Sequence, residues 1–267
     1  MKSYLNRKAL IFFLVLNCAV GTVTWAAPQR ATPVIPKKVL FIGNSYTSQV
    51  RKQLLQMLRN SPYRETTLRF ITKGGAKLKE HRKNETTLQV IKNGNWDYVV
   101  LQEQSQTPAI GGRSTRSFHA SVDALSEWIK ESGAQPVLYM TWGRRDGDRR
   151  NKMPTFANMQ SKLRRAYTSA AKRNNTILAP VGEAWAVVRD QNKDLGDQLF
   201  ASDGSHPSNK GAYLTACVFF RVLFNDSLAA IQSSDSLTDQ EWQVIKNAAL
   251  KVEIQDYSDH QGIRVSR

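Results

Sequence analysis

The chain has 267 residues, of which 41% are hydrophobic, 9% aromatic and 22% charged. These proportions are typical of a globular protein, and the length suits a single domain of the larger kind with a sizeable core. The sequence contains neither an internal repeat nor a second domain, and its formal net charge of +16 makes it strongly basic.

The first 26 residues have the pattern of a secretory signal peptide. Lys2, Arg7 and Lys8 form a basic start, residues 9–23 are mostly apolar, and cleavage is expected after Ala26. The apolar run is short for a membrane span, so a retained membrane anchor is the less favoured alternative. We therefore expect a secreted or periplasmic protein with no stable membrane insertion.

Export would limit both the disulfide chemistry and the partners of the mature chain. Loss of the signal removes Cys18 and leaves Cys217, which cannot form an internal disulfide, so core packing must supply the stability.

Nucleic acid is a poor partner for an exported protein. A basic surface would instead attract an anionic polysaccharide, another wall polymer or anionic lipid head groups. A charged surface that only maintains solubility is the alternative.

Beyond the signal, the chain alternates between strand-like and helical patterns. Residues 27–37 contain three prolines and no period, which indicates a linker. The expected strands cover residues 38–43, 67–72, 96–101, 136–141 and 176–181, and the expected helices residues 48–60, 78–93, 117–131, 154–173, 182–189 and 209–224. This alternation predicts an α/β domain over residues 38–232 with a five-stranded parallel sheet.

Residues 233–267 are interpreted as a C-terminal helix and tail packed on that domain. Thr238 and Glu241 have the spacing of a capping box at a helix start. Trp242 and Ile245 begin an apolar stripe that would face the domain.

Polar and glycine residues follow several of the predicted strands. Ser45 comes just after the first strand, Gly74-Gly75 after the second, residues 102–106 after the third and Trp142 after the fourth. Ligands of parallel sheets bind at the carboxyl ends of strands, so these residues are candidates for a site.

Three residue types in this chain suit nucleophilic catalysis. A serine hydroxyl needs a base to take its proton, and the base needs an acid that orients it. Asp203 and His206 share one short segment, so a single turn could join carboxylate and imidazole, and the sheet could bring both to Ser45. Taken alone, the serine would be a helix cap and the acid–imidazole pair a surface turn.

These residues resemble motifs of the SGNH (GDSL-like) hydrolase family over about residues 38–224. Phe41-Ile42-Gly43-Asn44-Ser45 is similar to its first block, with Asn44 where the common form has aspartate. Gly75 resembles the second block, and Asp203-Gly204-Ser205-His206-Pro207-Ser208 resembles the last.

The third block of that family is a glycine, any residue, then an asparagine, and here the chain departs from it. Gln102 stands in place of the glycine and Gln104 in place of the asparagine. This Gln-x-Gln form resembles a secreted branch of the family. Glutamine keeps the amide donor but is one methylene longer than asparagine.

The resemblance implies a three-layer α/β/α sandwich of the flavodoxin-like SGNH type and a catalytic triad. Ser45 would be the nucleophile, His206 the general base and then acid, and Asp203 the orienting acid. No metal and no cofactor is required. The other histidines, at positions 81, 119 and 260, have no clustered partners and are interpreted as structural or surface residues.

An oxyanion hole and a substrate site complete the implied arrangement. Backbone N–H groups of the nucleophile and of Gly75, with the amide of Gln104 or alternatively of Gln102, would hold the oxyanion. Asn44 and Trp142 are candidate substrate-binding residues, since a tryptophan at a strand end could form the wall of a sugar site. Packing in the core is the alternative for the tryptophan.

We therefore expect a secreted serine esterase that removes short acyl groups, such as acetyl, from a glycan. A non-catalytic glycan-binding module on the same fold is one alternative, favoured by the altered third block. A sugar O-acyltransferase is another, because the same residues could transfer an acyl group if water were excluded.

Overall fold

A computed structural model describes residues 35–36, 38–232 and 236–258 of the chain. The chain divides into residues 1–32 and residues 33–267, and all described residues belong to the second unit. The predicted signal peptide lies outside the described residues, as does the predicted linker apart from residues 35 and 36. In the part of the chain that is described, no helix is both long and apolar enough to cross a membrane.

The centre of the described unit is a sheet with the strand order β2-β1-β3-β4-β5-β6. The strands are β1 (Lys38–Gly43), β2 (Thr67–Thr72), β3 (Tyr98–Leu101), β4 (Gln135–Tyr139), β5 (Ile177–Ala179) and β6 (Gln255–Asp256). The first five strands are parallel, as predicted, and they have the order of flavodoxin-like sheets. The prediction of five strands missed β6, a two-residue strand that pairs antiparallel with β5.

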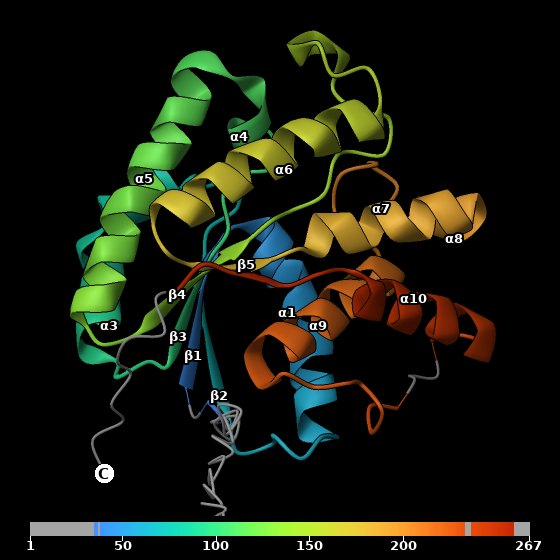
Figure 1. Cartoon of the computed structure of the whole chain (residues 1–267), viewed down its shortest axis with the longest axis horizontal. Helices are drawn as coiled ribbons and strands as arrows, with labels where there is room; N and C mark the ends of the chain where they lie inside the picture. The colour runs from blue at the N-terminus through green and yellow to red at the C-terminus, as the bar shows by residue number, and fades with distance from the viewer. Residues whose placement is uncertain (1–34, 37, 233–235, 259–267) are drawn as a thin grey trace, which may run out of the picture. The chain divides into compact units, whose positions relative to one another are not determined.

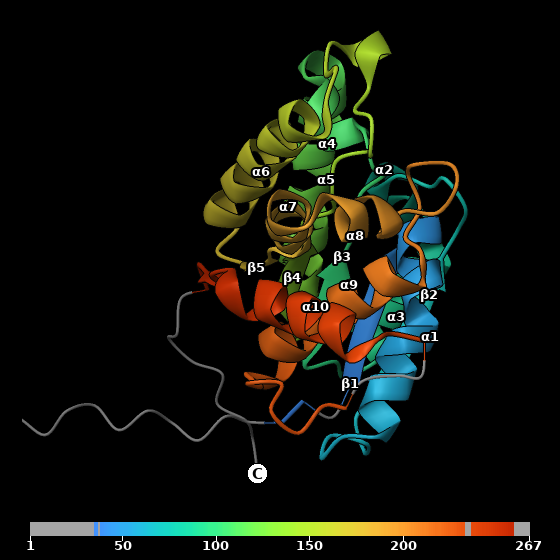
Figure 2. The same ribbon diagram turned by 90° about the vertical axis from the view of Figure 1, so that its right-hand side faces the viewer.

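Helices cover both faces of the sheet, which confirms the predicted three-layer α/β/α sandwich (Figures 1 and 2). One face carries α2 (Leu78–Arg82), α3 (Glu85–Asn93), α5 (Gly112–Glu131) and α6 (Phe156–Arg173). The other carries α1 (Ser45–Arg59), α7 (Val181–Gln191), α9 (Asn209–Phe224) and α10 (Asp239–Lys251). The remaining helices are α4 (Thr107–Ile110) and α8 (Lys193–Gln198), with a 3-10 turn at Arg149–Asn151.

Strand β1 shows why the apolar pattern of this sheet is continuous rather than alternating. Val39 and Phe41 point into the core beneath α1 and α9, whereas Leu40 and Ile42 point into the core beneath α3 and α5. All four side chains have no exposed surface. Burial of each such side chain contributes about 1.5–3 kcal/mol, so the strand is fixed from both faces.

Two predicted helices differ in their bounds because of side-chain caps. The predicted helix over residues 78–93 is two helices, since the Asn84 side chain accepts from the Thr87 N–H at 2.8 Å and starts α3 afresh. Helix α1 begins three residues earlier than predicted, at Ser45, because Asn44 caps it. The nucleophile candidate is therefore the first residue of a helix.

The predicted capping box at the start of α10 is present. The Thr238 hydroxyl accepts from the Glu241 N–H at 3.2 Å, and the Glu241 carboxylate accepts from the Thr238 N–H at 3.1 Å. Trp242 and Ile245 of the same helix are buried in the core shared with α9.

We expect Thr238→Ala to lower the free energy of unfolding by about 1 kcal/mol, because the Glu241 N–H in the first turn of α10 would lose its side-chain acceptor. The matched control is Thr238→Ser, which keeps the hydroxyl. Urea unfolding of the two variants and of the unmodified protein measures the difference. Equal midpoints for the alanine and serine variants would show that the cap does not stabilise α10.

Candidate active site

The three predicted catalytic side chains lie together at the carboxyl edge of the sheet. Ser45 follows β1 directly, next to the point between β1 and β3 where the strand order reverses. The Ser45 Oγ lies 2.8 Å from His206 Nε2, and His206 Nδ1 lies 2.5 Å from Asp203 Oδ2. This chain of hydrogen bonds joins residues 161 positions apart in the sequence.

The acid and the imidazole are held by one tight turn before α9. The second carboxylate oxygen of Asp203 accepts from the backbone N–H groups of Ser205 and His206, at 2.9 and 3.0 Å. Gly204 has φ +67°, a left-handed conformation that favours glycine. The Ala201 N–H donates to the His206 carbonyl at 2.8 Å and closes the turn.

These bonds keep the Asp203 carboxylate ionised. Partial burial raises its pKa, but hydrogen bonds from the His206 ring and from two backbone N–H groups outweigh burial and lower the pKa to about 2. The charged carboxylate therefore remains available to accept a hydrogen bond from His206 Nδ1–H, which leaves Nε2 facing Ser45.

A buried glutamine, Gln102, stabilises the turn that carries Ser45 through hydrogen bonds. The Gln102 side-chain oxygen accepts from the Asn44 N–H at 2.9 Å and from the Thr47 hydroxyl at 2.8 Å, and its amide nitrogen donates to the Glu103 carbonyl. A Cβ at Gly43 would lie 2.4 Å from the same oxygen, so the first block needs a glycine here. Gln102 has no exposed surface, and both ends of its amide are occupied within the protein.

Asn44 is also occupied within the protein. Its side-chain oxygen accepts from the Tyr46 N–H at 3.1 Å, and its amide nitrogen donates to the Ala76 carbonyl at 3.0 Å. Only 2% of the residue is exposed. Asn44 therefore caps α1 and ties the nucleophile turn to the turn after β2, and the structure leaves it little surface for the substrate contact predicted from the sequence.

Gly75 and Gln104 lie on the loops that follow β2 and β3, the two strands that flank β1. Gly75 is exposed and has φ +67° in a turn closed by a 3.0 Å hydrogen bond from the Ala76 N–H to the Lys73 carbonyl. The Gln104 side-chain oxygen accepts from the N–H groups of Gln106 and Thr107, at 3.0 and 3.1 Å. Its amide nitrogen makes only long contacts of 3.4 and 3.5 Å. The side chain is therefore held by its oxygen, while its N–H groups form only weak hydrogen bonds.

Glu103, which the sequence analysis did not single out, holds the third block in place. One of its carboxylate oxygens accepts from the N–H groups of Gln104 at 2.7 Å and Leu78 at 3.2 Å. Burial raises the pKa of this carboxyl to about 7, against the opposing effect of those two hydrogen bonds. The loop that carries Gln104 is thus tied to the start of α2.

The predicted role of Trp142 as the wall of a sugar site does not match its position. The indole has no exposed surface and lies between the rings of Tyr46 and Trp185, stacked at 4.8 and 3.9 Å. Its N–H donates to the Ser205 carbonyl at 3.0 Å. Trp142 therefore packs in the core and is hydrogen-bonded to the Asp203–His206 turn. This position agrees with the alternative interpretation, packing in the core.

Tyr46 is a site residue that the sequence analysis missed. Its ring meets the His206 ring edge-on at 5.3 Å, and its hydroxyl lies 2.7 Å from the Ser205 hydroxyl. The Tyr46 ring thus lies between the His206 imidazole, which it meets edge-on, and the Trp142 indole, on which it stacks. The position directly after the nucleophile was the one available signal.

Two other histidines have structural partners. His81 is buried in α2, and its Nε2 lies 2.8 Å from the Gly43 carbonyl, so it supports the end of β1. Burial lowers the pKa of its imidazole. His119 lies against α6, with Nε2 at 3.2 Å from the Ala166 carbonyl. His260 is outside the described residues.

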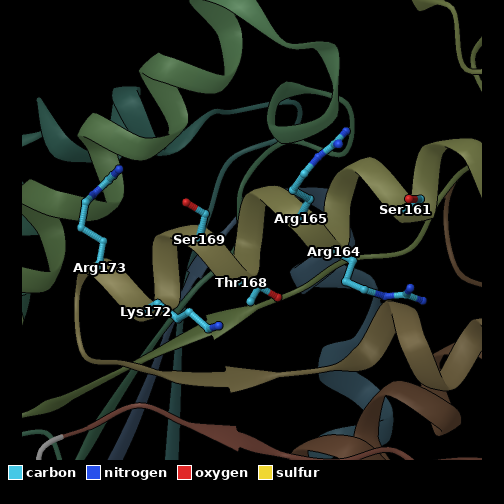
Figure 3. A pocket seen from close by; sticks show the side chains of 7 residues that line it. All are labelled: Ser161, Arg164, Arg165, Thr168, Ser169, Lys172 and Arg173. Atoms are coloured by element: carbon cyan, nitrogen blue, oxygen red, sulfur yellow. The ribbon is translucent and has the colours of Figure 1, made fainter.

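A surface hollow lies on α6, away from Ser45, Asp203 and His206. It has a volume of about 760 Å³ and is lined by Ser161, Arg164, Arg165, Thr168, Ser169, Lys172 and Arg173. Figure 3 shows these side chains spreading outward from the helix rather than converging. Arg164 pairs with Glu183 and Arg173 with Asp123, so part of this charge is neutralised.

The fold, together with the grouping of Ser45, Asp203 and His206, is typical of one class of protein, and a comparison with solved structures agrees with it. A protein from Slackia heliotrinireducens that is assigned to the SGNH hydrolases is 34% identical to this chain, with a TM-score of 0.57 over 68% of this chain and 96% of its own. The chain is therefore an SGNH-type hydrolase, a class of carboxylic ester hydrolases, as its motifs predicted.

Within that class, the chain belongs to the family described as "Domain of unknown function (DUF4886)", which matches residues 68–252. The matched region includes Asp203 and His206 and begins after Ser45. A DUF4886 family protein from Bacteroides uniformis has a TM-score of 0.67 and 21% identity, over 80% of this chain and 93% of its own.

More distant structures share the fold. A variant of an acetyl-xylooligosaccharide esterase from Geobacillus Stearmophilus has a TM-score of 0.56 and 17% identity, over 74% of this chain and 97% of its own. No curated protein matches the chain.

Proposed function

We propose that this protein is an exported serine esterase that removes short acyl groups, such as acetyl, from a glycan by way of an acyl-enzyme. The observation that carries the proposal is the hydrogen-bonded series Ser45–His206–Asp203, with distances of 2.8 and 2.5 Å. A module that only bound glycans would have no use for a nucleophile, base and acid aligned in this way.

In the first half of the reaction, the Ser45 Oγ attacks the ester carbonyl carbon while His206 Nε2 takes the hydroxyl proton. The tetrahedral intermediate collapses, the alcohol oxygen leaves with the proton that His206 returns, and the acyl group stays on the serine. In the second half, His206 takes a proton from water, which attacks the acyl carbon. The carboxylic acid then leaves and Ser45 regains its proton.

The negative charge of each intermediate needs nearby donors. The N–H of Ser45 at the start of α1, the N–H of the exposed Gly75 and the amide nitrogen of Gln104 are the donors we assign to it. The Gln104 oxygen is already fixed by the backbone of α4, so the longer glutamine could present its nitrogen as firmly as an asparagine. Gln102 is assigned a positioning role instead.

The site suits a bulky alcohol with a small acyl group. The His206 and Asp203 side chains are 31% and 49% exposed, so the catalytic edge is open to solvent and can receive part of a large molecule. The Geobacillus esterase with the same fold acts on acetyl-xylooligosaccharides. The signal-like N-terminal sequence would bring the enzyme to extracellular or periplasmic polysaccharide.

The test of this function is acetate release by the purified protein from 4-nitrophenyl acetate and from acetylated xylo-oligosaccharides. An added excess of unacetylated oligosaccharide distinguishes hydrolysis from transfer, because a transferase would yield newly acetylated sugar. We expect free acetate from both substrates. Absence of turnover on the aryl ester would contradict the proposal.

The two glutamines of the third block should fail in different ways when changed to alanine. Gln104→Ala should lower kcat about 10²-fold through loss of an oxyanion donor. Its loss of stability should be smaller than that of Gln102→Ala, because the N–H groups of Gln106 and Thr107 that lose an acceptor lie at a half-buried site. Gln102→Ala should lower the free energy of unfolding by about 1–3 kcal/mol, because the Asn44 N–H and the Thr47 hydroxyl would lose their buried acceptor.

Steady-state kinetics and urea unfolding of both variants test this contrast. Gln135→Ala is the matched control, since the Gln135 amide makes only a 3.4 Å contact, with its neighbour's carbonyl. The reverse pattern, a stable Gln102→Ala with the greater loss of kcat, would exchange the two roles.

A further inference from the structure

The two oxyanion donors assigned outside α1 lie on separate loops. Gly75 follows β2 and Gln104 follows β3, and β1, which leads into Ser45, lies between these two strands. The registers that pair β2 and β3 with β1 end at Thr72 and Leu101. Contacts beyond the sheet must therefore set the spacing of the two loops, and with it the position of both donors.

Three buried side chains join the loops after β1, β2 and β3 in pairs. The Asn44 amide nitrogen donates to the Ala76 carbonyl at 3.0 Å, which joins the first loop to the second. The Gln102 oxygen accepts from the Asn44 N–H at 2.9 Å, which joins the third loop to the first. Glu103 accepts from the Leu78 N–H at 3.2 Å and so joins the third loop to the second.

The Glu103 contact differs from the other two because a single oxygen holds the backbone of both loops. The oxygen that accepts from the Leu78 N–H also accepts from the Gln104 N–H, at 2.7 Å. Leu78 begins α2 shortly after the turn of Gly75. When ionised, the carboxylate forms charge-assisted hydrogen bonds, which are about twice as strong as neutral ones. It therefore acts on the position of both donor loops at once.

Stability does not by itself account for a carboxyl at this position. Glu103 is only 1% exposed, and burial of a carboxylate costs free energy. Burial raises the pKa of Glu103 to about 7 although its two hydrogen bonds oppose this shift. An apolar side chain in the core would avoid that cost, but it would leave the N–H groups of Gln104 and Leu78 without this acceptor.

We propose that Glu103 is a positioning residue, whose carboxylate oxygen sets the distance between the Gly75 and Gln104 loops and so aims both donors at the oxyanion. This inference rests on the proposed esterase function and adds a residue that acts through the assigned donors. Glu103 does not touch the substrate in this account. Its replacement should therefore alter the chemical step and leave substrate binding almost unchanged.

The first test is steady-state kinetics on 4-nitrophenyl acetate. Glu103→Ala should lower kcat about 10- to 100-fold and change KM by less than about three-fold, because a displaced donor weakens binding of the transition state alone. Glu103→Gln should keep kcat within about three-fold, since its amide oxygen can accept from the same two N–H groups. Equal losses of kcat in the alanine and glutamine variants would overturn the proposal.

Urea unfolding shows whether each variant is folded. A neutral side chain at position 103 suits the fold, because the carboxyl already has a pKa of about 7. Should Glu103→Ala not fold, Glu103→Asp takes its place, since the shorter side chain keeps the charge but cannot hold both N–H groups. Glu103→Asp should then show the same loss of kcat, and full activity in a folded Glu103→Asp would overturn the proposal.

A double-mutant cycle separates positioning from a general loss of stability. Gln104→Ala should lower kcat about 10²-fold in the unmodified protein but less than about 10-fold in the Glu103→Ala background, or in Glu103→Asp where that variant takes its place, where the donor is already displaced. Effects of the two substitutions that multiply independently would show that Glu103 does not act through Gln104.

The matched control is Glu80→Ala. The Glu80 carboxylate also holds the start of α2, where it accepts from the Lys77 N–H at 3.2 Å, but its side chain is 50% exposed. Its removal should keep kcat within about two-fold. An equal fall in Glu80→Ala and Glu103→Ala would assign the effect to α2 and overturn the proposal.

The two proposals fail in different ways. Absence of turnover by the unmodified protein would contradict the esterase function. Turnover by the unmodified protein that a folded Glu103→Ala retained in full would overturn the role of Glu103 and leave the esterase function standing.

Discussion

Ser45→Ala should lower kcat/KM for 4-nitrophenyl acetate by at least about 10³-fold, because the acyl-enzyme cannot form without the Oγ. The hydroxyl lies 2.8 Å from His206 Nε2, so the base that would activate it is already in contact. Loss of the Ser45 hydroxyl leaves the N-terminal cap of α1 intact, since the Asn44 side chain supplies that cap. The loss should therefore be in catalysis and not in folding.

Steady-state kinetics of Ser45→Ala and of Ser48→Ala give the comparison. Ser48 is an exposed serine of the same helix, so its replacement controls for the loss of a hydroxyl near the N-terminus of α1. Ser48→Ala should retain its activity within about two-fold. Activity of Ser45→Ala near that of the control would remove Ser45 from the mechanism.

Asp203→Asn should lower kcat about 10³- to 10⁴-fold at neutral pH, the size of effect seen when the acid of a serine triad becomes an amide. An asparagine keeps the shape of the turn but cannot accept the His206 Nδ1 proton as a charged group. The imidazole would then lose its preferred orientation and the stabilisation of its protonated form.

The same residue predicts a pH dependence of stability. The pKa of Asp203 is lowered to about 2 in the folded protein, against about 3.9 in an unfolded chain. A lowered pKa means that the carboxylate stabilises the fold above about pH 4 and that this contribution is lost as the pH falls towards 2. Asp203→Asn should thus be less stable than the unmodified protein at pH 6, and the difference should shrink towards pH 2.

Thermal unfolding of both proteins between pH 2 and pH 7 tests this, and kcat is measured over the upper part of the range. Because Asp203 stays ionised above about pH 4, its titration should produce no acid limb in the kcat profile there. A stability difference that grew as the pH fell would have the wrong sign for the hydrogen bonds described.

The sequence could indicate that Ser45, Asp203 and His206 lie together, because strand order and local turn geometry determine their positions. A serine directly after a buried strand and an Asp-x-x-His before a helix both reach the carboxyl edge of a parallel sheet. The Asp203 turn is also local: its hydrogen bonds span two and three residues. Neither placement depends on how distant side chains pack.

The roles of the supporting residues could not be predicted in the same way, because they depend on contacts between distant segments. Gln102 bonds to Asn44, 58 residues away, and Trp142 bonds to Ser205, 63 residues away. From the sequence alone, an amide or an indole at the end of a strand is equally consistent with ligand binding and with packing in the core. Strand β6 was missed because two residues carry no period.

Covalent labelling with a fluorophosphonate tests whether Ser45 is a nucleophile that His206 activates. Peptide mass spectrometry of the labelled, folded protein should find the phosphonyl group on Ser45, and the labelling rate should fall strongly in His206→Ala. A folded protein that takes no label at Ser45, or labels it as fast without His206, would contradict the account.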